Sequence, residues 1–208
     1  MKAIKIETSV SEKDLTNKSH WWGFPDLPLG VEFPYYENHN EADGYDDTMT
    51  FICQIRLEDL SALDKDNLLP KTGMLYFFAN MDYFLEESDE LYDGLGYWSE
   101  KNFKVIYSPE CNDLHTHKVL YSDGTPACLP AEEMVFSQTE SRDYGLKLLG
   151  KPYFDEVPQR GYVNLLQIDE EDRWHLRFYD CGMVNFLIKK SDLLALNFDK
   201  VKLYMHCL

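Results

Sequence analysis

Short segments in which apolar and polar residues alternate recur along the chain, and a period of two is typical of β-strands that bury one face. β-Branched and aromatic residues are frequent in these segments, which supports the same interpretation. The predicted strands cover residues 51–57, 74–79, 103–107, 162–168, 174–179, 183–189 and 200–206. Tight turns are predicted at the acidic residues 169–172 and at the Asp-Cys-Gly run 180–182, so the fourth, fifth and sixth strands should form two hairpins.

Helical patterns are fewer and shorter than strand patterns. Ser191 and Asp192 are suited to begin a helix that continues to Leu196, and residues 58–63 form a second short candidate. The chain has 208 residues, which fits one domain spanning residues 1–208. The expected fold class is therefore α+β, mainly antiparallel β-sheet with short helices.

A three-part pattern occurs twice and predicts an internal duplication of two related β-rich halves. Each copy has a Gly-x-Pro turn, an apolar strand that contains Gln followed by Ile, and a strand that begins with Gly-Met. The first copy is Gly23–Pro25, Phe51–Ile55 and Gly73–Phe78; the second is Gly150–Pro152, Asn164–Ile168 and Gly182–Leu187. The halves would span about residues 20–108 and 145–208.

Several short sequence segments, taken in their order along the chain, resemble those of the YwqG-like family, whose domain has no established function. They are residues 23–28, 51–55, 69–78, 104–107, 148–152, 165–169, 180–183, 186–188 and 191–193. The resemblance runs from about Trp22 to the C-terminus, and it implies a single-domain, mostly β, α+β fold with two related halves. It implies no catalytic or cofactor residues. Lys151 and His206 depart from the family pattern, which has Tyr and Gln there.

The charge excludes some partners. Twenty basic and 37 acidic residues give a net charge of −17, which would repel the phosphates of nucleic acids. Residues 74–79 form the longest apolar run and are too short to span a membrane. Five cysteines and no apolar leader segment indicate reduced thiols, so we expect a cytoplasmic protein.

The acidic residues are concentrated in two segments that lack Lys and Arg, residues 19–55 and 72–100, each with seven acids. Tyr and Trp residues are interspersed with them, a combination that suits an interface with a basic partner. The predicted partner-binding residues are Trp21, Trp22, Asp43, Tyr45, Asp46, Asp47, Glu86, Glu87, Asp89 and Glu90. The same composition is also typical of solvated acidic loops beside an aromatic β core.

Metal and catalytic chemistry has little support in the sequence. Cys111, Asp113, His115, His117 and Cys128 include zinc-binding residue types, but their spacing matches no closed zinc site. The two acidic segments lack the ligand order of an EF-hand loop. Nucleophile-elbow, phosphate-loop, dinucleotide-binding and zinc-protease motifs do not occur. We therefore predict no metal, no cofactor and no catalytic residue.

Two functional hypotheses remain, and they belong to different classes. The favoured one is a monomeric, non-enzymatic binding module that engages a basic protein, as immunity proteins do with nuclease-like toxins. The alternative is an enzyme or small-molecule binder with a cleft between the two halves. A scaffold without a concave site is a third option.

Overall fold

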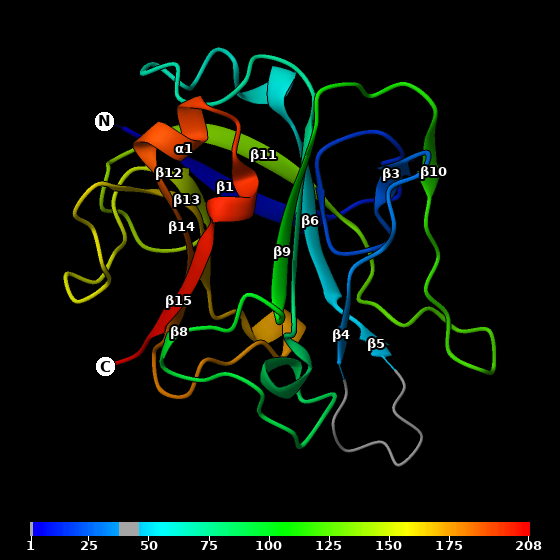
Figure 1. Ribbon diagram of the computed structural model, residues 1–208. Helices are drawn as coiled ribbons and strands as arrows, with labels where there is room; N and C mark the ends of the chain where they lie inside the picture. Colours follow the sequence, from blue (N-terminus) through cyan, green and yellow to red (C-terminus); the bar gives the residue numbers. More distant parts are fainter. Residues whose placement is uncertain (1, 38–45) are drawn as a thin grey trace.

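The computed structural model describes residues 2–37 and 46–208, and most of its strands belong to one strongly curved antiparallel sheet of 11 strands (Figure 1). The strand order is β8-β15-β14-β13-β12-β1-β11-β2-β6-β7-β9. The strands are β1 (Ala3–Val10), β2 (His20–Trp21), β6 (Thr50–Arg56), β7 (Met74–Ala79), β8 (Gly96–Tyr97), β9 (Phe103–Ser108), β11 (Glu132–Thr139), β12 (Lys147–Leu149), β13 (Tyr162–Asp169), β14 (Met183–Lys189) and β15 (Lys202–His206). Two small ribbons lie beside this sheet, β3 (Asp26–Pro28) with β10 (Leu114–Thr116) and β4 (Tyr35–Glu37) with β5 (Asp46–Thr48).

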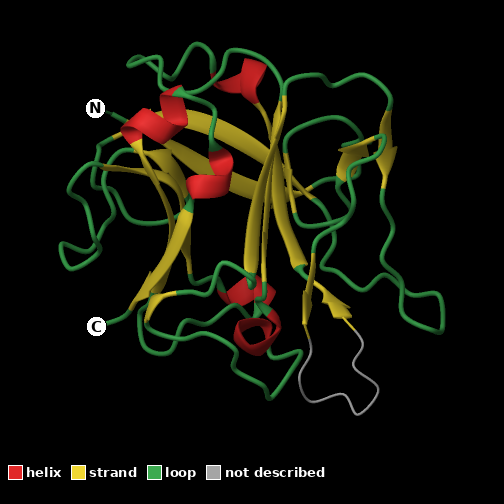
Figure 2. Ribbon diagram, viewed as in Figure 1, coloured by secondary structure: helices red, strands yellow, loops and turns green. Residues whose placement is uncertain are grey.

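The fold is essentially all-β, so the predicted α+β class was wrong. Within the described residues the longest helix is α1 (Lys190–Leu194), a single turn, and the rest are short 3₁₀ turns (Figure 2). These are η1 (Leu57–Leu60), η2 (Asp82–Leu85), η3 (Asp172–Trp174) and η4 (Phe198–Lys200). The two predicted helices begin close to the expected places but end within about one turn, too short to form a layer. No helix in this part of the chain has the length and apolarity needed to cross a membrane.

The curvature of the sheet lets it pack against itself, and this replaces a helical layer as the source of the core. The sheet has two arms, one from β12 to β8 and the other from β2 to β9, on either side of the central strands β1 and β11. Side chains from both arms meet inside the curve. The rings of Phe77 on β7 and Phe186 on β14 touch edge to face, with centroids 5.2 Å apart. Both rings are completely buried, within one cluster that draws on most strands of the sheet.

Six of the seven predicted strands are present, some with ends shifted by one or two residues. The prediction for residues 174–179 was wrong, because β13 pairs directly with β14 and residues 170–182 connect them. Trp174, Leu176 and Phe178 are buried there, which explains the alternating pattern without a strand. His175 and Tyr179 have positive φ angles of 53° and 67°, which interrupt an extended backbone.

The two predicted hairpin turns are therefore the two ends of this connection. The carboxylate of Glu170 links the two ends of the connection. Its Oε1 accepts hydrogen bonds from the backbone N–H groups of Phe178 and Gly182, at 2.8 and 3.1 Å. The connection runs beneath the strands, at one end of the curved sheet (Figure 1). Its side chains Trp174, Leu176 and Phe178 are buried.

The two strands at the centre of the sheet, β1 and β11, were not predicted from the sequence. They pair with each other, and on either side of them the strands follow in matching order. β1 is followed by β12, β13, β14 and β15; β11 is followed by β2, β6, β7 and β9. β6 and β13 also carry a bulge at matching places, before Cys53 and Leu166. The duplication stays a prediction, and these correspondences are what it would explain.

Gln54 and Gln167 make matching hydrogen bonds. Each side chain binds the part of the chain that follows a Gly-x-Pro turn and holds it against the outer side of the sheet. The Oε1 atom of Gln54 accepts from the N–H of Asp26, which follows the first Gly-x-Pro turn, at 2.8 Å. The Oε1 atom of Gln167 accepts from the N–H of Tyr153, which follows the second Gly-x-Pro turn, at 2.9 Å. Each Nε2 donates to a backbone carbonyl before the adjacent strand, Lys18 in one half and Gly145 in the other.

We expect Gln54→Glu to lower the free energy of unfolding by about 3 kcal/mol at neutral pH. The new carboxylate would face the carbonyl of Lys18 and the carboxylate of Asp26, which now accept hydrogen bonds from Nε2. Urea unfolding monitored by fluorescence measures the loss. Gln138→Glu, an equal charge change at an exposed position on β11, is the control and should cost no more than about 0.5 kcal/mol. Equal losses for both variants would contradict the role of Gln54.

Candidate functional site

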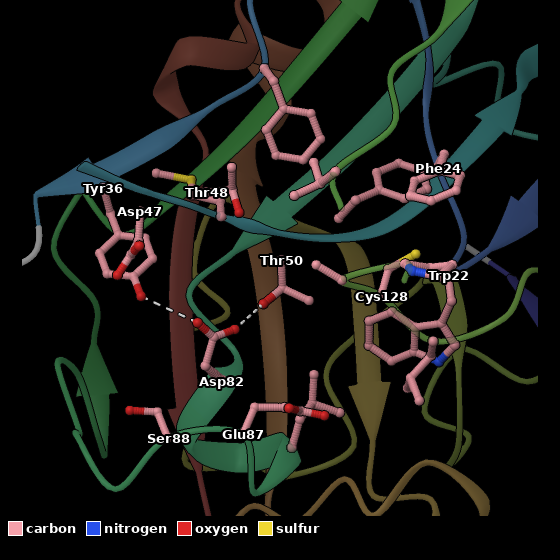
Figure 3. A pocket seen from close by; sticks show the side chains of 18 of the residues that line it. Trp22, Phe24, Tyr36, Asp47, Thr48, Thr50, Asp82, Glu87, Ser88 and Cys128 are labelled. Carbon is pink, nitrogen blue, oxygen red and sulfur yellow. Dashed lines mark hydrogen bonds between the residues drawn. The ribbon is translucent and has the colours of Figure 1, made fainter. Parts of the chain in front are cut away.

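A pocket of about 670 Å³ opens around the first residues of β6, on the same side of the sheet as the ribbon of β4 and β5 (Figure 3). Five parts of the chain meet there: the turn after β2, the β4–β5 ribbon, the start of β6, η2 with the loop after it, and residues 119–129. The polar lining residues are Tyr36, Asp47, Thr48, Thr50, Asp82, Glu87, Ser88, Glu90, Tyr92 and Tyr121. The apolar ones include Trp22, Phe24, Phe33, Met49, Leu85, Cys128 and Leu129.

Asp82, the first residue of η2, is a pocket carboxylate whose two oxygens both accept hydrogen bonds from protein hydroxyl groups. Its Oδ1 accepts a hydrogen bond from Thr50 Oγ1 at 2.7 Å, and its Oδ2 accepts one from Tyr36 Oη at 3.2 Å (Figure 3). Thr50 pairs with Ala79 at the end of β7, so the sheet brings this hydroxyl beside η2. Burial raises the pKa of the Asp82 carboxyl, the two hydrogen bonds oppose that shift, and the charge of Asp47 adds to it.

Two tyrosines extend the polar side of the pocket away from Asp82. The rings of Tyr36 and Tyr92 meet edge to face with centroids 5.1 Å apart. The hydroxyl of Tyr92 donates to Glu90 Oε2 at 3.1 Å. Burial, and then Glu90, raise the pKa of Tyr92 to about 12, with smaller contributions from Asp47 and Asp82. Negative charges therefore act on one another across this side of the pocket.

No Lys, Arg or His is found among the described residues that line the pocket, although four carboxylates line it. A negative charge surrounded by protein loses hydration, and an opposite charge nearby favours its ionised form. A cation entering this pocket would therefore be stabilised by Asp82 and the three other carboxylates, whereas an anion would be repelled.

The opposite side of the pocket is built by a turn that only glycine permits at one position. Trp22 and Gly23 have φ angles of 54° and 77°, and a Cβ atom on Gly23 would lie 2.7 Å from Cβ of Ala131. The N–H of Gly23 donates to the carbonyl of Leu129 at 2.9 Å, which joins this turn to residues 119–129. Phe24, the next residue, is half-buried and borders the pocket.

Cys128 lines the pocket and is a possible nucleophile by residue type, but its environment disfavours the thiolate. Burial raises the pKa of Cys128 to about 11, so the thiol is neutral at physiological pH. Among the lining residues that the structure describes, there is no histidine that would accept its proton. A buried, neutral thiol is a weak nucleophile.

The structure separates the predicted partner-binding residues into four groups, of which the two tryptophans are the last. Asp47, Glu87 and Glu90 line the pocket. Glu86 and Asp89 are exposed on the same loop but do not line the pocket, and Asp46 lies in β5. Asp43 and Tyr45 lie outside the described residues.

Trp21 and Trp22 belong to the interior, so their rings cannot serve as surface anchors. They are 0% and 1% exposed. Both pack on Trp174 from the β13–β14 connection, with ring centroids 5.6 and 5.4 Å away. The indole N–H of Trp174 in turn donates to Glu132 Oε1 at 2.9 Å. The three indoles thus join the two arms of the sheet.

Three important pocket residues were not among the predicted site residues: Tyr36, Thr50 and Asp82. A carboxylate shortly after the wholly apolar strand 74–79 is a usable signal for Asp82, because strand ends commonly present side chains to a site. Thr50 and Tyr36 had no such signal, since their role depends on contacts with a residue more than 30 positions away.

Two further expectations concern metals and clefts. Within residues 2–37 and 46–208 there is no group of three metal-binding side chains, and the ring of His117 packs against Phe33 at 4.9 Å. A second, more open pocket of about 560 Å³ lies among residues 144–208. Neither of these two pockets has walls from both predicted halves, because the first is formed by residues 22–129.

The comparison with known families gives one result. The model of a family described as a domain of unknown function, DUF1963, matches residues 19–207. Because the match covers nearly the whole chain, the protein belongs to this family. The expectation of a family without an established function is thereby confirmed, whereas the YwqG-like name stays a prediction. No curated protein matches the sequence.

The raised pKa of Asp82 predicts how pH changes stability. A carboxyl with a raised pKa binds its proton more tightly in the folded protein, so stability falls as pH rises from the ordinary value of 3.8 to the raised one. Asp82→Asn removes this dependence, so the stability of wild type relative to the variant should fall over that range and then level off. Thermal unfolding at a series of pH values measures the difference.

Asp123→Asn provides a control of opposite sign. Hydrogen bonds from Thr125 lower the pKa of the exposed Asp123 carboxyl. The stability of wild type relative to this variant should therefore rise with pH over the acidic range. If the stability of wild type relative to Asp82→Asn also rises with pH, the pKa of Asp82 is not raised by burial, and the prediction is wrong.

Proposed function

We propose that this DUF1963 protein binds a basic partner protein by taking a cationic side chain of that partner into the acidic pocket. The observation that carries the proposal is the Asp82 carboxylate, held by Thr50 and Tyr36 in a concave site that three more carboxylates line. A held carboxylate forms strong charge-assisted hydrogen bonds with Lys or Arg. Its orientation by two neighbours lowers the cost of ordering on binding.

The overall charge supports the same proposal at longer range. The chain carries a net charge of −17, and the four carboxylates that line the pocket belong to the two segments without Lys or Arg. A strong negative charge of this kind attracts a basic protein before contact. Such attraction is screened by salt, whereas contacts inside a partly closed pocket are screened less.

A small cationic molecule is the second candidate ligand. A volume of about 670 Å³ falls within the usual range for small-molecule pockets, and it exceeds what one lysine side chain fills. The chemistry of recognition would be the same, with Asp82 and its neighbouring carboxylates binding an ammonium or guanidinium group.

An octapeptide of alternating Lys and Gly with blocked termini is a suitable probe for the proposed function. We expect it to bind the wild-type protein, and the double variant Asp82→Asn with Glu90→Gln to bind about tenfold more weakly or worse. Calorimetric titration at about 20 mM and about 300 mM salt measures both affinities and their salt dependence. The loss should persist at the higher salt concentration, because the pocket shields these two charges.

The double variant Glu156→Gln with Asp180→Asn is the matched control. It removes the same net charge from exposed positions outside the pocket, so its affinity should stay within about twofold of wild type. If the control pair weakens binding as much as the pocket pair, the attraction is a property of the total charge, and the pocket has no special role.

A further inference from the structure

We infer that the group bound in this pocket is amphipathic: a cationic head joined by a short linker to an apolar body such as an aromatic ring. This inference rests on the proposed function and names the ligand class more narrowly. It follows from the division of the pocket into two chemically different sides (Figure 3). Tyr36, Asp47 and Asp82 lie on one side of the view, and Trp22, Phe24 and Cys128 lie on the other.

The charged side has capacity left for a cationic head. An ionised carboxylate offers about four acceptor positions. Asp82 uses two of them, one for Thr50 and one for Tyr36. The remaining positions accept hydrogen bonds from an ammonium group, and the nearby rings of Tyr36 and Tyr92 add a weaker attraction for a cation.

The described residues on the apolar side carry no charged side chain. Phe24 is only partly buried, so its ring retains surface that a ligand can cover. Leu129 and the neutral thiol of Cys128 adjoin it in the lining. Trp22 contributes little surface, because it is almost completely buried and its ring packs against Trp174.

A small cation that occupied only the charged side would leave this apolar surface in contact with water. Covering apolar surface is favourable in proportion to the area removed from water. An aromatic ring attached to the cation by a short linker would cover it, and this should raise affinity about tenfold or more relative to the bare cation. In a partner protein, the corresponding epitope is a basic residue next to an aromatic or aliphatic one.

Three small probes separate the two contributions: 2-phenylethylamine carries both charge and ring, ethylamine carries the charge alone, and 2-phenylethanol carries the ring alone. We expect 2-phenylethylamine to bind at least tenfold more tightly than either of the others in NMR titrations of the full-length protein. Phe24→Ala should weaken 2-phenylethylamine several-fold and leave ethylamine unchanged, which also shows that the variant is folded. Asp82→Asn should weaken both amines.

The outcomes distinguish failure of this inference from failure of the proposed function. If both amines bind equally well, or if the Lys-Gly octapeptide binds while no small probe does, the amphipathic ligand is excluded and cation recognition stands. If 2-phenylethanol binds as tightly as 2-phenylethylamine, the charge contributes nothing and both proposals fail. Both also fail if neither amine nor the octapeptide binds.

Discussion

The outer side of the sheet near the pocket depends on one buried contact, the side-chain amide of Gln54 against Asp26. Gln54 is completely buried, and its amide binds both the backbone N–H and the carboxylate of Asp26. The same carboxylate accepts from the N–H of Asn17 and the hydroxyl of Thr116, and the carbonyl of Asp26 accepts from Tyr76 Oη. Because buried polar groups are costly when unpaired, these contacts constrain one another strongly.

This network links the fold to the candidate site. It holds the chain immediately after the turn at Gly23, so that Phe24 borders the pocket, and it ties β10 to β3 beside it. The opposite side is held by Asp82, which joins η2 to β6 through Thr50. The pocket thus lies between two polar anchors, each formed by a carboxylate and a residue of β6, and both anchors rest on the rigid sheet.

Particular residues show how far sequence reasoning reached. Asp47, Glu87 and Glu90 were predicted from charge segregation, and the structure brings these three to one pocket. Trp21 and Trp22 came from the same pattern, yet both are core residues, because an aromatic ring beside acidic residues can face either way across a sheet. The place of Asp82 after the apolar strand 74–79 was its one local signal, and it was missed because its role comes from hydrogen bonds to Thr50 and Tyr36, which lie more than 30 positions away in the sequence.

The sequence by itself determined most strands of the two arms, the paired glutamines after their Gly-x-Pro turns, and the concentration of acids in two segments. These features follow from local periodicity and composition, which a linear pattern records directly. Only the tertiary structure decided that residues 170–182 fill the end of the curved sheet, that β1 and β11 form its centre, and that four of these acids line one pocket. Those outcomes depend on pairing between distant segments, where burial and hydrogen-bond satisfaction outweigh local preference.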